Sequence, residues 1–308
     1  MALPLVDWTG WAAAAIDGFA PRWHALARGD FALRGIARAM TAPERRGGLT
    51  AKFAIGGREW YRTDGQATCT DEDGWLVLAE GERYASRIAA DRPVTTLALF
   101  FAPATIAAAR AARGSDVALL DDPLARASDE PVGGGCRRLA FDPELARAVA
   151  DADDVAGVCE LHALALDRIL DAAARAAGER ARIAAVRPST RAELHRRLCR
   201  AHDLLMTAYA EPLSLDDLAR AATMAPHHFL RRFRAAFGVT PHRALIARRI
   251  AVAERLLRTS HAPIGEIATA VGFGSLAAFS ARFRRETGRS PRAMRALSTR
   301  YASFHETA

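Results

Sequence analysis

The amino-acid sequence predicts an α+β protein in which a small antiparallel barrel or sandwich with flanking helices precedes an all-α C-terminal domain. Three observations support this class: short strand-like runs between residues 49 and 102, helical spacing of apolar residues after residue 103, and an internal repeat near the C-terminus. A chain of 308 residues also exceeds what one hydrophobic core usually serves. We therefore expect three segments, namely a barrel domain over 1–140, a helical linker or dimerisation segment over 141–187, and a second domain over 188–300.

The predicted barrel rests on alternating apolar residues that are interrupted by turn signals. Turns are expected at Gly56-Gly57 and at Glu80-Gly81. The runs between them cover residues 49–55, 59–61, 75–78, 83–88 and 93–101. Strands at about ten-residue spacing are typical of a small barrel or sandwich. Residues 1–48 show no readable pattern.

Helical spacing dominates the rest of the chain. A loop is expected over 115–135, and a helix begins at Pro143 with Asp142 as its N-cap. A longer helix is expected over 158–177, ended by Gly178. Its stripe of alanine and leucine suits close packing, either as a dimer interface or against the barrel.

An internal duplication with a period of about 50 residues is the most informative feature. One copy runs from Leu213 to Leu245 and the other from Ala262 to Arg295. In the first copy, Ser214 and Asp216 can cap a short helix, and Pro226 fits the first turn of a second helix. Three phenylalanines of that second helix recur at i, i+4 and i+8 and are expected to face inward, namely Phe229, Phe233 and Phe237. Each copy therefore predicts a helix-turn-helix unit.

A single helix from about Pro241 to Thr259 is expected to join the two units. At about 1.5 Å per residue it spans roughly 28 Å. A rigid connector of that length can place two recognition helices about one duplex turn (~34 Å) apart on one face of DNA.

The charge of the chain is concentrated in its C-terminal part. Residues 189–308 contain 20 arginines, no lysine and nine acidic residues, a net charge of +11, whereas residues 1–188 have a net charge of −3. Such a domain attracts a polyanion through phosphate contacts and counter-ion release. Together with the duplication, this asymmetry predicts DNA binding. A rival class is a basic architectural protein that binds DNA without sequence preference.

The second copy resembles the signature of the AraC family of bacterial transcription regulators. The matching residues are Ile264, Ile267, Ala268, Val271, Gly272, Phe273, Phe279, Phe283, Gly288, Pro291 and Arg295. The resemblance covers about residues 194–295 and implies two helix-turn-helix units joined by a long helix. It also implies an N-terminal domain that senses a small molecule, makes a dimer, or does both. The strand-rich region then resembles a cupin-like half-barrel.

The resemblance implies a set of DNA-contacting residues. They are His227, His228, Leu230, Arg231, Arg234, Ser275, Leu276, Ala277, Ser280, Ala281, Arg282 and Arg285. Arg231 can donate a bidentate pair to guanine. The family often has arginine where Ala281 stands, so we expect the first unit to supply most of the specificity. The second unit is expected to position the protein on DNA through phosphate contacts, made by Arg282, Arg284 and Arg285.

For the N-terminal domain the sequence leaves two alternatives open. Four aromatic residues either line an effector pocket or belong to the barrel core and rim: Trp60, Tyr61, Trp75 and Tyr84. Its acidic side chains are interpreted as solvated turn charges, namely Glu59, Asp71, Glu72, Asp73, Glu80 and Glu82.

An enzyme is not expected, and neither is a cofactor. Only His24 among nine histidines precedes residue 162, so the strand region offers no imidazole cluster for a metal. The four cysteines are far apart and are interpreted as reduced thiols. The expected partners are double-stranded DNA, RNA polymerase, a second copy of the chain and an unidentified small-molecule effector. No membrane contact and a cytoplasmic location are expected. Activation and repression are not distinguished.

Overall fold

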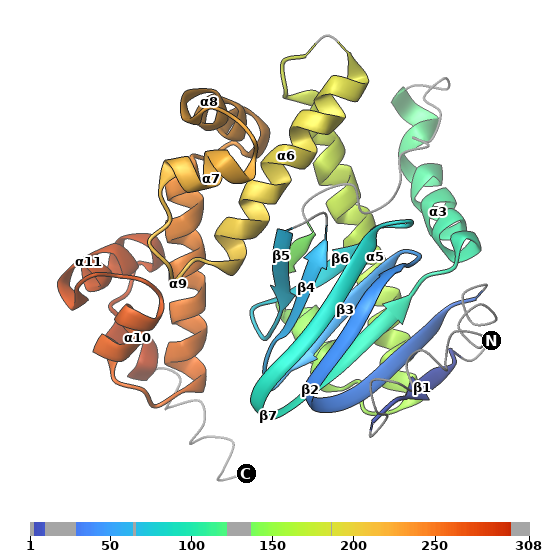
Figure 1. Cartoon of the computed structure of the whole chain (residues 1–308), viewed down its shortest axis with the longest axis horizontal. Helices are drawn as coiled ribbons and strands as arrows, with labels where there is room; N and C mark the ends of the chain where they lie inside the picture. Colours follow the sequence, from blue (N-terminus) through green and yellow to red (C-terminus); the bar gives the residue numbers. More distant parts are fainter. Residues whose placement is uncertain (1–2, 10–28, 64–65, 122–136, 186, 297–308) are drawn as a thin grey trace. The chain divides into compact units, whose positions relative to one another are not determined.

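The computed structural model describes residues 3–9, 29–63, 66–121, 137–185 and 187–296. It divides the chain into two compact units, Met1–Cys199 and Arg200–Ala308. The division falls within helix α6 (Pro188–Thr207). Both units are drawn in Figure 1. The three segments expected from the sequence stay predictions.

The first unit is built on one eight-stranded mixed sheet, which confirms the predicted α+β class. The strands are β1 (Leu5–Asp7), β2 (Phe31–Arg46), β3 (Thr50–Ile55), β4 (Glu59–Thr63), β5 (Gln66–Thr70), β6 (Gly74–Leu78), β7 (Arg83–Phe100) and β8 (Arg138–Ala140). Hydrogen bonds order them β1-β2-β7-β3-β6-β8, and β4 pairs with both β5 and β7. Only the β1–β2 pair is parallel among the described strands. The strand order is open, and the cupin-like character stays a prediction.

The sequence pattern missed β2 and divided β7 wrongly. Strand β2 is rich in alanine, and its pairing with β7 shifts register between Ala37 and Ala39 and again between Ala42 and Arg45. Such irregularities break the in–out alternation on which strand recognition depends. Strand β7 continues through Pro93 because β2 pairs with Ala89 and then with Val94, which leaves the proline in an unpaired bulge.

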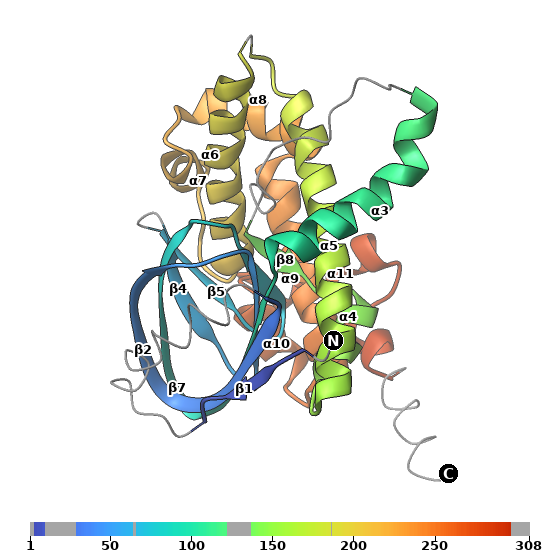
Figure 2. The same cartoon turned by 90° about the vertical axis from the view of Figure 1, so that its right-hand side faces the viewer.

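Strand β7 curls so strongly that its two ends meet the same side chain. The Lys52 ammonium lies 5.3 Å from the ring centre of Tyr84 and 4.8 Å from that of Phe100. Along a straight strand these two residues would be about 53 Å apart, at roughly 3.3 Å per residue. The arc of β7 in Figure 2 therefore wraps the concave side of the sheet around Lys52.

The two faces of the sheet carry separate cores. Successive strand residues point to opposite faces. On one face, Phe53 and Trp75 pack in a large core with residues of the helices that cover this face. On the other, Tyr61 and Tyr84 form a buried cluster with Leu76 and Leu78. Strands β4 and β6 are not hydrogen-bonded neighbours, so this second cluster spans the concave side.

In the described part of the first unit, the sheet is accompanied by α3 (Pro103–Asp121), α4 (Pro143–Ala150), α5 (Val155–Ala181) and the start of α6. The predicted N-cap is confirmed, since Asp142 accepts hydrogen bonds from the backbone of Glu144 at 3.0 Å and Leu145 at 2.9 Å. Two helix ends were predicted wrongly. Helix α3 runs to Asp121, into the expected loop. Helix α5 passes through Gly178 and ends at Ala181. The rest of that loop, from residue 122 to 135, lies outside the described residues.

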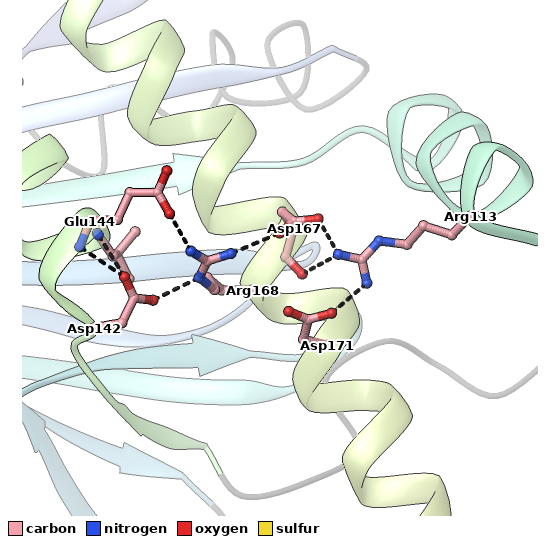
Figure 3. Close-up of polar contacts among 7 residues, drawn as sticks. Arg113, Asp142, Glu144, Asp167, Arg168 and Asp171 are labelled. Atoms are coloured by element: carbon pink, nitrogen blue, oxygen red, sulfur yellow. Dashed lines mark hydrogen bonds and ion pairs between the residues drawn. The ribbon is translucent and has the colours of Figure 1, made fainter. Parts of the chain in front are cut away.

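Two arginines tie these helices together (Figure 3). Arg168 of α5 donates to Asp142 at 2.7 Å and to Glu144 at 2.6 Å, at the start of α4. Arg113 of α3 donates to Asp171 of α5 at 2.9 Å. The partners are partly exposed, so each pair contributes about 1 kcal/mol or less. Their effect is mainly to fix which turns of the helices face one another.

A buried ion pair joins β8 to the end of β5. The Arg138 guanidinium is 1% exposed and binds the Asp71 carboxylate as well as the main-chain oxygen of Cys69. Burial alone would raise the pKa of Asp71, but the Arg138 charge and hydrogen bond more than offset it and hold that pKa below its usual value. The interpretation of Asp71 as a solvated turn charge was therefore wrong. It was also wrong for Glu59, which is buried on β4.

The second unit consists of helices that match the predicted repeat. They are α7 (Leu215–Ala221), α8 (Pro226–Phe237), α9 (Pro241–Thr259), α10 (Ile264–Ala270) and α11 (Leu276–Thr287), preceded by the end of α6. The predicted bounds of the connector helix α9 are confirmed. Ser214 caps α7 as predicted, but its capping-box partner is Asp217 and not Asp216. Helices α7–α8 and α10–α11 pack at different levels along α9 (Figure 1).

Arg249 of α9 binds three main-chain carbonyls. Its guanidinium donates to Tyr209 at 2.7 Å and to Glu211 at 3.0 Å, beyond the end of α6. It also donates to Gly272 at 2.7 Å, in the turn between α10 and α11. Gly272 has a φ of +85°, and a Cβ there would lie 2.6 Å from the Ala210 carbonyl oxygen. The corner of the second helix-turn-helix is thus fixed to the connector by a side chain and by a close backbone approach.

We predict that Asp71→Asn destabilises the first unit by about 3–5 kcal/mol, because it leaves the buried Arg138 charge uncompensated. Urea unfolding followed by tryptophan fluorescence measures this, since all five tryptophans lie within residues 8–75. The double variant Asp71→Asn, Arg138→Met should recover most of the loss. A loss below about 1 kcal/mol in the single variant would contradict the ion pair's role.

The same pair predicts a dependence on pH. Because the folded-state pKa of Asp71 is depressed, its contribution is complete above the unfolded pKa of about 3.9. It is lost as pH falls through the lower folded value. In a pH series of urea midpoints, Asp71→Asn should lack this part of the wild-type acid sensitivity. Parallel curves below pH 5 would argue against it.

We predict that Arg249→Met destabilises the second unit by about 2–3 kcal/mol, through loss of charged hydrogen bonds to three carbonyls. Arg258→Met is the matched control. Arg258 lies on the same helix, is half-exposed and reaches only Glu254 at 3.7 Å, so its loss should cost under about 1 kcal/mol. Circular dichroism at 222 nm should detect the earlier transition, while tryptophan fluorescence stays unchanged. Equal effects of both variants would refute a special role for Arg249.

Candidate nucleic-acid interface

Helix α8 is held so that one face points away from its unit. Pro226 occupies its first turn, and Gly238 ends it in the left-handed conformation with a φ of +74°. Phe229 and Phe233 are fully buried, and Phe237 is partly buried against the ring of His202. The predicted inward face is therefore confirmed, and the remaining positions form the outer face.

The outer face of α8 contains all five residues expected from the sequence. They are exposed: His227, His228, Leu230, Arg231 and Arg234. A guanidinium nitrogen of Arg231 lies 3.2 Å from Nδ1 of His228, one turn earlier on the same face. This contact leaves the other guanidinium N–H groups of Arg231 available to a base edge or phosphate.

Helix α11 exposes a different chemistry. Ser275 is its N-cap, and the Ser275 hydroxyl accepts a hydrogen bond from the backbone of Ala278 at 3.2 Å. Leu276, Ala277 and Ala281 are exposed, and Ser280 is half-buried. The exposed face thus presents small and apolar groups, which can contact a thymine methyl but cannot donate a bidentate pair.

The arginines of α11 are not equivalent. Arg282 is partly buried and pairs with Glu286 at 3.3 Å, one turn later. Arg284 and Arg285 are exposed, and Arg285 lies at 3.9 Å from the same carboxylate. Arg284 and Arg285 are therefore better placed than Arg282 to reach a phosphate.

Sequence reasoning missed the residues that position these helices. Besides Arg249, Arg248 is 6% exposed, donates to the Met206 carbonyl at 3.2 Å and lies over the Tyr209 ring at 4.9 Å. In the sequence these two look like any other arginines of a basic domain. Their partners are 23 to 42 positions away, so no local signal identifies them.

The four aromatic residues expected in the N-terminal domain do not come together. Tyr61 and Tyr84 lie on the concave face with ring centres 6.2 Å apart. Trp75 stacks on Phe53 in the opposite core, and Trp60 is 39% exposed on the outer face. Strand alternation explains the separation, because neighbours in a strand point to opposite faces.

Buried ionisable groups surround the two tyrosines. Burial lowers the pKa of Lys52 and raises that of Glu59. Burial also raises the pKa of Tyr61 well above its usual value. For Tyr84 burial opposes ionisation, but the nearby charges of Lys52 and Arg45 outweigh it and lower the pKa. The concave face is thus unusually polar for a buried face of a sheet.

Other kinds of site have little support in the described part of the chain. It contains no group of three or more His, Cys, Asp or Glu side chains that could hold a metal ion. Among the described residues, no disulfide is formed by Cys69, Cys159 or Cys199. Cys136 lies outside the described residues. Of the described helices, none has the length and apolar character needed to cross a bilayer.

A family model described as a helix-turn-helix domain matches residues 218–296, from α7 to beyond α11. The chain is 33% identical over 92 residues to the probable transcriptional regulator LumQ of Photobacterium leiognathi and 36% identical over 87 residues to the transcriptional activator RhaS of Escherichia coli O139:H28. It is 37% identical over 82 residues to a putative AraC-like transcription regulator of Streptomyces antibioticus.

These matches cover 30%, 28% and 27% of this chain and 34%, 31% and 27% of the relatives. The chain thus spans about a third of the length of the curated relatives it matches. Among solved structures, the DNA-binding domain of AdpA in complex with a target DNA is 37% identical. That match covers 33% of this chain and 91% of that one, with a TM-score of 0.32.

The family model and the curated relatives agree with the signature in the second copy of the repeat. That signature lies on α10 and α11, where its apolar residues form the core and its glycines the corners. The C-terminal domain of this chain is therefore a helix-turn-helix domain of the AraC type.

Proposed function

We propose that this chain is a sequence-specific DNA-binding transcription regulator of the AraC type, controlled by a small molecule at its N-terminal domain. The observation that carries the proposal is the pair of exposed helix faces on α8 and α11, borne by one connector helix in a domain with net charge +11. Phosphate contacts supply affinity and base-edge contacts supply specificity.

Within this proposal the two units divide the work. The first reads bases through Arg231, supported by its contact with His228. The second positions the protein on phosphates through Arg284 and Arg285, and its exposed alanines allow close approach to the groove. In the proposed function the chain is not an enzyme. It acts as a homodimer, and it contacts RNA polymerase.

One observation favours a second candidate, an architectural protein without sequence preference. The exposed face of α11 offers few hydrogen-bonding side chains. A base-reading protein should bind its site at least about 10³-fold more tightly than random DNA, whereas an architectural protein should not. The exposed guanidinium of Arg231 favours the first candidate.

We predict that selection from genomic fragments with the purified protein yields a shared motif that spans two adjacent major-groove segments. The selected site and random DNA are then compared at two salt concentrations. Binding to both should weaken as salt rises, because counter-ions are released, but the preference for the selected site should persist. Absence of an enriched motif, with affinity that depends on salt alone, would favour the architectural candidate.

We predict that Arg231→Ala reduces discrimination at one guanine position by ~1–3 kcal/mol. Ser280→Ala should reduce sequence preference less. Arg285→Ala is the matched charge control, and it should weaken binding to all sequences alike and lower the salt slope by about one. Competition binding against single-base variants of the site measures all three. A larger loss of preference from Ser280→Ala than from Arg231→Ala would contradict the division between units.

A further inference from the structure

The concave face of the N-terminal sheet holds a cation that DNA binding does not use. Lys52 is 4% exposed, and its ammonium lies over the rings of Tyr84 and Phe100. In the described part of the chain, no carboxylate lies within ion-pair distance of this ammonium. A buried ammonium without a counter-ion is strongly unfavourable, so such groups usually have a partner or a function.

The ionisable groups around Lys52 supply a hydrogen bond, from its ammonium to the Tyr84 hydroxyl, but no ion pair within the described residues. Arg45 of β2 adds a second cation, which donates to the Tyr84 hydroxyl at 3.2 Å. Glu59 of β4 is the one carboxyl among the groups that influence Lys52, and it faces Arg45 as well. Tyr61 is neutral at ordinary pH because burial raises its pKa. Two cations therefore share one carboxyl and the Tyr84 hydroxyl on a face removed from water.

Two hydroxyls on the same face also lack partners. Thr50 is two residues before Lys52 on β3, so its side chain points the same way. Thr68 stands opposite Tyr61 in the β4–β5 pair, which places both on the concave face. The side-chain oxygens of both threonines are buried and have no hydrogen-bond partner among the described residues. Unsatisfied buried hydroxyls are uncommon in folded proteins and suit a polar guest.

Large apolar side chains occupy another part of this face. Phe31 and Phe100 stack with ring centres 4.1 Å apart, and Leu76 and Leu78 are fully buried across the concave side. Ligand sites in proteins combine such apolar walls with a few convergent polar groups. Here the polar groups are two cations, one carboxyl and several hydroxyl groups.

We propose that the concave face binds a small organic acid, whose carboxylate pairs with the Lys52 ammonium and whose apolar body lies against Phe100 and Leu76. This inference rests on the proposed control of the protein by a small molecule, and it assigns the chemical class of that molecule. The Thr50 and Thr68 hydroxyls donate to the remaining carboxylate lone pairs or to polar substituents. A neutral analogue forfeits the charge-assisted contact with Lys52.

The test uses the full chain and two matched ligand pairs, benzoate with benzamide and hexanoate with hexanamide. Tryptophan fluorescence follows thermal unfolding of the N-terminal unit. At about ten times its Kd, at least one carboxylate should raise Tm by about 3–6 °C, whereas its amide should not. Lys52→Met should weaken carboxylate binding at least tenfold, roughly the loss of one charged hydrogen bond.

The variants separate a ligand site from a structural role. Without ligand, Lys52→Met should be as stable as the wild type or more stable, because it removes a buried charge. Arg62→Met is the matched control, since Arg62 is an exposed cation on the outer face of β4 and should keep the full response. Equal shifts by acids and amides, no shift by either acid, or an unchanged response in Lys52→Met would each overturn the inference.

DNA binding is measured on the same samples. Selective DNA binding without any response to acids would overturn this inference and leave the regulator in place. A response to acids without selective DNA binding would overturn the proposed function instead, and would leave an acid-binding domain on a basic DNA-binding protein.

Discussion

The curl of β7 around the Lys52 ammonium is the constraint on which the rest of the N-terminal unit depends. Strand β7 pairs with β2 along one edge and with β4 and then β3 along the other. When β7 bends, the three strands paired with it (β2, β3 and β4) must therefore bend as well. Bulges in the β2–β7 pair provide the bend, and the proline at position 93 sits where no ladder bond is lost. The result is a concave face that holds charged groups away from water.

Local signals explain how much of the fold could be predicted. The start of α9 follows from Thr240 and Pro241, and the end of α8 follows from Gly238, so each of these boundaries is encoded within a few residues. Strand β3 was predictable because Ala51 and Phe53 alternate with other residues along a regular strand. Strand β2 was not, because alanines give little contrast between faces and its bulges shift the alternation.

In the candidate interface, too, features encoded by neighbouring residues could be predicted, and features that depend on distant residues could not. The outward residues of α8 could be predicted because they are the complement of Phe229 and Phe233 on one helix. The role of Asp71 could not, because its partner Arg138 is 67 positions away. The same holds for Arg249, whose carbonyl partners lie outside its own helix. The role of a charged residue depends on tertiary contacts that the local sequence does not show, whereas apolar periodicity can be recognised within a single helix or strand.

The corners of the two helix-turn-helix units differ in which residues they can accept. Each needs a residue in the left-handed conformation, and the first copy places Thr223 there with a φ of 53°, exposed to solvent. The second copy has Gly272, and the Ala210 carbonyl and Arg249 occupy the space that a side chain would need. Packing at the second corner leaves no room for a residue larger than glycine. The first corner is exposed and holds a threonine, so the two copies of one motif should accept different substitutions at equivalent positions.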